Sequence, residues 1–198
     1  MGDIRLPEAQ RSGGMPLRNA IQARRSVRAF SQRRFRLDDP ADLQILSDLL
    51  WTAWGFITDK RRAAPSSHNR QETDVYVLLP EGAFLYDAAG NRLVQQSTED
   101  LRAASGAQDY VGTAAAELAF VARTEVVTGK TPRGVVETIY VDTGFISQNI
   151  YLFCASEGLA TVVRAMVPKE SLAAALGLAP TQEITLVQTV GWSECQKK

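Results

Sequence analysis

The chain has 198 residues, and its 22 basic and 22 acidic side chains cancel to a formal net charge of zero. Hydrophobic residues make up 45% of the chain and charged residues 22%, which is ordinary for a folded domain and excludes a disordered or fibrous protein. The neutral balance also argues against a nucleic-acid binder that relies on a broad phosphate footprint. We therefore expect one domain over residues 1–198 and no nucleic-acid partner.

The cysteines and the single histidine predict neither a disulfide framework nor a metal site. Cys154 and Cys195 form no spaced pair with each other or with His68. No run of residues approaches the roughly 18 to 20 consecutive apolar residues of a membrane span. The first residues lack the basic start and apolar middle of a signal peptide. We expect no metal, no membrane insertion and a cytoplasmic protein, although removal of a leader peptide would leave the same sequence.

Two helices are predicted in the first third of the chain. A short helix begins at Pro16 and ends before an arginine-rich turn. The second begins at Asp39-Pro40, where an N-cap carboxylate precedes proline at the first helical position, and it continues to Gly55. Strand patterns follow over residues 75–79, 83–86 and 92–95. The turn-rich segment between the last two predicts a hairpin.

The second half of the chain is less regular. Residues 98–104 are polar and predict a helix, residues 114–122 fit a buried strand or a short helix equally well, and residues 127–135 predict a mobile loop. A long helix is predicted over residues 138–158. Because it is apolar on several faces, the fold or a partner chain must bury it. A helix over 168–176 and a strand over 183–190 complete an α+β order.

An arginine-rich segment after the first helix is the first candidate binding site. Arg24, Arg25, Ser26 and Arg28 bring guanidinium groups and a hydroxyl together within five residues. Guanidinium groups bind phosphate through two hydrogen bonds and stay charged, so the segment suits a phosphate monoester. A solvated charged face explains the same residues and stays open as the alternative.

A second candidate is the polar segment Pro65, Ser66, Ser67, His68 and Asn69. Its hydroxyls and amide can bracket the polar edge of a heterocycle, because they both donate and accept hydrogen bonds. The same residue types favour turns and helix caps, which is the alternative explanation. A lone histidine without a carboxylate beside it is weak evidence for a general base. We therefore predict no catalytic side chain.

In this order, the two segments resemble those of the nitroreductase family of FMN-dependent oxidoreductases. The resemblance continues through the long predicted helix, the turn that follows it and the closing strand, at residues 142–145, 148–155, 158–161 and 187–191. Within the family, the chain is most similar to the SagB-type dehydrogenases of thiazole/oxazole-modified peptide biosynthesis. That similarity lies at residues 4–7, at residues 49–55 and in the hairpin around Tyr86-Asp87.

The resemblance implies a mostly antiparallel central sheet flanked by helices, and a homodimer with its long buried helix and two FMN molecules at the interface. It implies ping-pong hydride transfer from NAD(P)H through flavin N5 to a nitro, quinone, enone or similar small-molecule acceptor. Three alternatives stay open. They are a SagB-like oxidative dehydrogenase of peptide azolines, a low-turnover flavin-binding module, and a phosphate-ligand binder that keeps the fold without flavin.

Family contacts carry over onto this chain residue by residue. Arg24, Arg25, Ser26 and Arg28 would hold the phosphate, the ribityl chain and the pyrimidine side of the ring, with Arg28 beside the charge that reduced flavin carries. Pro65, Ser66, Ser67 and Asn69 would approach the flavin from the other subunit. The remaining expected contacts are Gln108, the segment Val163, Arg164 and Ala165 with a backbone N–H facing N5, and Lys197 or Lys198 at the phosphate.

Two departures from the family pattern put the substrate side in doubt. Val163-Arg164-Ala165-Met166 stands where the best-known nitroreductases have Pro-x-Glu-Gly, and Glu72 stands where many members have Pro-Trp. The fold and the cofactor depend less on these positions than the substrate does.

Overall fold

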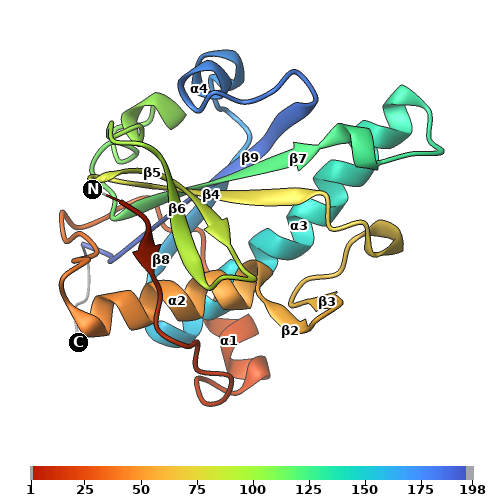
Figure 1. Cartoon of the computed structure of the whole chain (residues 1–198). Helices are drawn as coiled ribbons and strands as arrows, with labels where there is room; N and C mark the ends of the chain where they lie inside the picture. Colours follow the sequence, from red (N-terminus) through yellow and green to blue (C-terminus); the bar gives the residue numbers. More distant parts are fainter. Residues whose placement is uncertain (1, 195–198) are drawn as a thin grey trace.

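The computed structural model describes residues 2–194 and consists of a central sheet with helices on both faces (Figure 1). Among these residues, seven strands form the sheet in the order β1-β6-β5-β4-β7-β9-β8, and each neighbouring pair is antiparallel. The strands are β1 (Ile4–Arg5), β4 (Thr73–Leu79), β5 (Gly82–Asp87), β6 (Arg92–Ser97), β7 (Ala116–Arg123), β8 (Ala160–Arg164) and β9 (Gln182–Gly191). Two short strands, β2 (Phe56–Thr58) and β3 (Arg61–Arg62), form a separate hairpin.

The helices divide between the two faces of the sheet. They are α1 (Leu17–Ala23), α2 (Pro40–Trp54), α3 (Pro132–Glu157) and α4 (Lys169–Ala175), with 3-10 turns η1 (Ser67–Asn69), η2 (Ala103–Ser105) and η3 (Thr124–Val126). In β4, Val75 and Val77 face the core that holds α2 and α3, whereas Tyr76 and Leu78 face the core that holds α4. Because successive side chains of a strand point to opposite faces, one strand serves two cores. The α+β prediction is confirmed.

The helix-start signals explain where α2 and α3 begin. The Asp39 carboxylate accepts a hydrogen bond from the Ala41 N–H at 2.9 Å, and Pro40 opens α2 as predicted. Thr131 and Pro132 use the same device in α3, where the Thr131 hydroxyl accepts from the Gly134 N–H at 3.2 Å. Helix α3 therefore begins six residues before the predicted start, and the prediction of a loop over residues 127–135 is wrong from Pro132 onward.

The structure corrects the prediction in two other segments and decides between the two alternatives in a third. Residues 98–104 are not a helix, because only the short η2 turn forms there and Arg102 is tied by its own side chain to Asp100. The undecided segment 114–122 is strand β7. Strand β8 occupies the predicted turn after Gly158, which ends α3 in the left-handed conformation with φ of 70°.

Helix α3 is buried on one side only. Ile139, Ile146 and Ile150 are fully buried, whereas Val141 and Phe145 are 56% and 45% exposed. Val136, near the start of the helix, is also exposed, but it precedes Phe145 by nine residues and therefore points to the opposite side of the helix. Within residues 2–194, no helix combines the length and hydrophobicity that a bilayer crossing requires.

Candidate functional site

The outer edge of strand β8 collects the first group of predicted site residues. Strand β8 is the last strand of the sheet and pairs with β9 on one side only. On its open side, the Thr161 carbonyl accepts from the Val27 N–H at 3.0 Å, and the Val163 N–H donates to the Tyr151 hydroxyl at 3.0 Å. The arginine-rich segment therefore meets this edge at Val27 and continues to Phe30, which bridges to Ser193 just after β9.

Tyr151 of α3 joins the arginine-rich segment to β8. Its hydroxyl lies 2.9 Å from the Ser26 hydroxyl and also accepts from Val163, while the Arg24 guanidinium stands 5.3 Å from the centre of its ring. The residue is only 7% exposed. Sequence reasoning missed Tyr151. The one available signal was a hydroxyl within the otherwise apolar run of residues 150–155, which does not reveal partners far along the chain.

The arginines of the segment have different neighbours. Arg25 donates to the carbonyls of Gln22 and Arg24 at 2.7 and 2.9 Å, so its side chain closes helix α1. Arg28 is exposed and makes no hydrogen bond or ion pair with any residue in the described range. Arg24 contacts the Tyr151 ring and nothing acidic. Arg24 and Arg28 are therefore the side chains that remain available to an anion.

The segment after Val163 presents a backbone donor rather than a side chain. The Val163 N–H is already taken by Tyr151. The Ala165 N–H, two residues further along the same edge, has no hydrogen-bond partner among residues 2–194, and Ala165 is exposed. If one backbone N–H of this segment faces a ligand, Ala165 supplies it.

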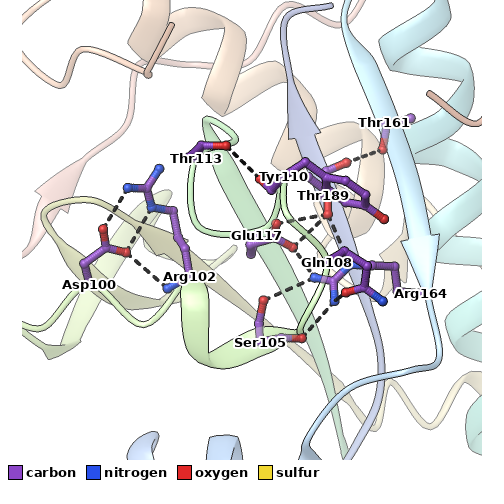
Figure 2. Close-up of polar contacts among 10 residues, drawn as sticks. All are labelled: Asp100, Arg102, Ser105, Gln108, Tyr110, Thr113, Glu117, Thr161, Arg164 and Thr189. Carbon is purple, nitrogen blue, oxygen red and sulfur yellow. Dashed lines mark hydrogen bonds and ion pairs between the residues drawn. The ribbon is translucent and has the colours of Figure 1, made fainter. Parts of the chain in front are cut away.

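Arg164 points the other way, into the protein, and brings Gln108 to the end of β8 (Figure 2). Its guanidinium donates to the Glu117 carboxylate at 2.6 Å, to the Ser105 carbonyl at 2.8 Å and to the Gln108 side-chain oxygen at 3.4 Å. Arg164 is 6% exposed and Glu117 is fully buried. The side chain of Arg164 therefore serves this network, and only its backbone lies on the edge.

Glu117 is the acidic centre of that network. Both of its oxygens accept from the Thr189 hydroxyl at 3.0 Å, in addition to the contact with Arg164. Burial raises the pKa of Glu117 to about 7, while Arg164 and Thr189 oppose that rise. Sequence reasoning did not identify Glu117, because its two partners follow it by 47 and 72 residues.

The second predicted segment, residues 65–69, lies against the other half of α3. The Ser67 N–H donates to the Asp142 carboxylate at 2.7 Å. Asp142 precedes Tyr151 by nine residues on one helix, a rise of about 13 Å. The structure therefore brings Arg24, Ser26 and Val163 together around Tyr151 and joins Gln108 to the Arg164 side chain. It leaves Pro65, Ser66, Ser67 and Asn69 apart from them within one protomer.

Local hydrogen bonds hold the 65–69 segment in shape. The Ser66 hydroxyl accepts from the Gln71 N–H at 3.0 Å, and the Asn69 amide donates to the Lys60 carbonyl at 3.0 Å. Asn69 also has a positive φ of 54°. These contacts match the turn-and-cap explanation. The Ser67 hydroxyl contacts Arg70, and Pro65 is exposed.

A second buried glutamate lies behind this segment. Glu72 is 0% exposed, and no side chain among the residues described donates a hydrogen bond to its carboxylate oxygens. Burial, together with the neighbouring Asp142, raises the pKa of Glu72 to about 7, and Arg70 opposes the rise. The remaining predicted site residue, Lys197, lies outside the described residues.

Comparison with known proteins places the whole arrangement in a family. The model of the Nitroreductase family matches residues 21–192. A crystal structure from Ralstonia eutropha, assigned to the nitroreductases, shares 35% identity and a TM-score of 0.90, and the match covers 99% of this chain and 91% of that one.

Two more distant structures share the fold alone. One is the E. coli microcin synthetase McbBCD complex, with 17% identity and a TM-score of 0.73 over 87% of this chain and 71% of that one. The other is a Staphylococcus epidermidis protein assigned as an NAD(P)H:FMN oxidoreductase, with 12% identity and a TM-score of 0.67 over 96% and 93%. The long family match and the Ralstonia structure agree: this chain belongs to the nitroreductase family, whose members are oxidoreductases that generally use a flavin.

Proposed function

We propose that this protein is an FMN-dependent oxidoreductase that binds FMN at the outer edge of β8. The observation that carries the proposal is the chemistry of the groups at that edge. They are the Ser26 hydroxyl, the Arg28 guanidinium and the Ala165 N–H, and segments 24–30 and 160–167 contain no acidic residue. The Gln108 amide lies beside the Arg164 guanidinium, at the end of the same strand. FMN offers a phosphate dianion and a ring rich in acceptor atoms, so a set of donors and cations fits it.

Each group has a role in the proposed complex. Arg24 and Arg28 hold the phosphate or the pyrimidine side of the ring, and Ser26 donates or accepts at the ribityl chain. The Ala165 N–H is the donor toward N5. Arg25 acts indirectly, by ending α1 at the right place. Bound FMN supplies the hydride chemistry, with NAD(P)H as donor and a nitro, quinone or enone compound as acceptor.

The proposed oligomer is a homodimer built on α3. Its exposed face carries Val141 and Phe145, and an apolar face of this kind favours burial against a second copy. A two-fold axis near Phe145 would place the 65–69 segment of one protomer opposite the Tyr151 half of the other. The two predicted groups, separate in one protomer, would then line one site.

The test of cofactor binding is a fluorescence titration with FMN. Wild-type protein is expected to quench flavin fluorescence with a saturable Kd. Arg28→Ala is expected to raise that Kd by at least about tenfold, because a charge-assisted hydrogen bond contributes roughly 1.5 to 3 kcal/mol. Arg61→Ala, an exposed arginine on β3, is the matched control and should leave the Kd unchanged. Absence of saturable FMN binding by the wild type would contradict the proposal.

Anaerobic addition of NADPH and then NADH to the FMN complex tests the reaction. Bleaching of the flavin band by either nicotinamide supports the reductase. Bound FMN that neither nicotinamide reduces would instead favour an oxidative dehydrogenase of peptide azolines, or a flavin-binding module. The resemblance of residues 4–7 and 49–55 to SagB-type dehydrogenases makes the azoline reaction the second candidate.

Sedimentation velocity tests the dimer. Phe145→Glu and Val141→Glu place charge on the exposed face of α3 and are expected to yield monomers with a raised Kd for FMN. Ala89→Glu, at an exposed position between β5 and β6, is the control and should sediment like the wild type. A monomeric wild type that binds FMN fully would remove the dimer from the proposal.

A further inference from the structure

The side-chain amide of Gln108 has a fixed orientation, and Arg164 determines it. The Arg164 guanidinium faces the Gln108 side-chain oxygen at 3.4 Å (Figure 2). A guanidinium has donors only, so the end of the amide that faces it must be the oxygen. The amide nitrogen of Gln108 therefore points away from Arg164, and no residue of the described chain accepts a hydrogen bond from it.

The side chain of Arg164 is itself held on several sides. Glu117 binds one of its nitrogens at 2.6 Å, and the Ser105 carbonyl and hydroxyl accept from the guanidinium at 2.8 and 3.2 Å. The Thr189 hydroxyl accepts from its Nε at 3.3 Å and in turn donates to Glu117. A buried guanidinium with this many partners cannot rotate without leaving charges unpaired.

The backbone passes close to this network at Gly106. A Cβ at that position would overlap both the Arg164 guanidinium and the Gln108 side-chain oxygen. The absence of a side chain at Gly106 lets residues 105–108 lie directly on Arg164. The loop is thereby tied to the end of β8, where Ala165 presents its free N–H.

We propose that Arg164, anchored by Glu117, orients Gln108 as an obligate hydrogen-bond donor to an acceptor atom of the bound flavin. Arg164 and Glu117 are positioning residues, and Gln108 is the contact. The inference rests on the proposed function, because the acceptor belongs to FMN. The family resemblance implied a contact between Gln108 and the flavin but not the direction of its hydrogen bond. Here Gln108 donates to the flavin and does not accept from it.

Two substitutions of Gln108 separate a donor from a structural contact. Gln108→Glu keeps the shape and still offers Arg164 an oxygen, but it turns a second oxygen toward the ligand. Gln108→Met removes the donor without adding charge. At pH 8, Gln108→Met is expected to raise the FMN Kd about tenfold and Gln108→Glu about a hundredfold, because the latter adds repulsion to the lost bond. The reduction potential of the bound flavin should also fall most in Gln108→Glu.

A purely structural Gln108 predicts the opposite order. Glutamate would then bind Arg164 more tightly than glutamine does, so Gln108→Glu would bind FMN as well as the wild type, and that result would overturn the inference. Glu117→Gln is the second test. It keeps the shape at Glu117 but weakens the anchor, and it should raise the FMN Kd severalfold and shift the flavin absorption band. An unchanged Kd and spectrum would also count against the inference.

The two proposals fail in different ways. If the wild type binds no FMN, the proposed function and this inference both fall. If the wild type binds FMN and Gln108→Glu binds it equally well, only the inference falls. The free energy of unfolding of each variant, measured by urea titration without FMN, is the control for loss of the fold. Gln108→Met decides the matter if Gln108→Glu does not fold.

Discussion

Two buried glutamates, one within β7 and one directly before the neighbouring strand β4, have opposite surroundings. Glu117 of β7 contacts the Arg164 guanidinium and the Thr189 hydroxyl. Glu72, just before β4, receives no hydrogen bond from a side chain in the described chain and faces Asp142. Burial raises the pKa of both carboxyl groups to about 7. Burial alone therefore does not determine the role of a carboxyl group. Its neighbours determine whether it pairs with an arginine or takes up a proton.

The largest expected effect comes from removing the partner of Glu117. Arg164→Met removes the one arginine of the described chain that hydrogen-bonds to this buried carboxylate, and loss of one member of a buried ion pair costs about 3 to 5 kcal/mol in the free energy of unfolding. Urea denaturation at pH 7.5 measures it. Arg92→Met, which breaks exposed pairs with Asp87 and Asp3, is the control and should cost less than about 1 kcal/mol. Equal losses of unfolding free energy in the two variants would show that the buried pair with Glu117 contributes no more than an exposed pair.

The second prediction concerns Glu72 and has the opposite sign. Because its pKa in the folded protein is raised from 4.5 to about 7, the folded state holds more protons than the unfolded state between these values. The free energy of unfolding therefore falls as the pH rises through this window. Glu72→Gln removes the buried charge and is expected to stabilise the protein by about 2 to 3 kcal/mol at pH 8, with little effect at pH 4.5.

Urea denaturation across pH 4.5 to 8 measures this difference. The exposed Glu99 supplies the control, since Glu99→Gln should run parallel to the wild type over the whole range. A Glu72→Gln variant that is less stable than the wild type at pH 8 would mean that the Glu72 carboxylate is bound by a group that stabilises its charge.

A smaller effect is expected at Tyr151. Tyr151→Phe keeps the ring under Arg24 but removes the hydroxyl that contacts Ser26 and Val163. The lost hydrogen bonds should cost about 1 to 2 kcal/mol in unfolding free energy. The Kd for FMN should rise as well, because the arginine-rich segment loses one of its two ties to β8. Tyr140→Phe, on the same helix, is the comparison for FMN binding; a similar rise in both variants would speak against a specific role for Tyr151.

The smallest effect is expected on the surface of α3. Arg133 and Glu137 form an exposed pair at 2.7 Å, one helical turn apart. Arg133→Ala should change the free energy of unfolding by no more than about 0.5 kcal/mol. Thermal unfolding in low and high salt measures it, and a loss above 1 kcal/mol would show that exposed pairs matter here as buried ones do.

The sequence predicted helix ends where adjacent residues form the cap. Asp39-Pro40 predicted the start of α2, and Gly158 predicted the end of α3. The start of α3 was missed because Gly129 and Gly134, on either side of Pro132, suggested a loop and hid the same capping signal. Strand β8 was missed because its five residues follow a helix end directly and carry no turn of their own.

Residue chemistry alone identified candidate site residues only where they are adjacent in sequence. The segments around Arg24 and Ser67 were identified in this way, and Val163 and Gln108 were identified by the family resemblance. Tyr151, Glu117 and the orientation of Gln108 were not, because each depends on partners brought together by the sheet: Gln108 meets Arg164 across 56 residues. Hydrogen-bond partners at such separations leave no periodic pattern in a single sequence.

The open edge of β8 has one further consequence, for association between chains. An unpaired strand edge is a template on which a strand from another molecule can add. Here Val27 and Tyr151 occupy two of the edge groups, so the segment proposed to hold the cofactor also blocks that addition. Loosening residues 24–28 would therefore do more than release a ligand, since it would uncover a sheet edge that invites aggregation.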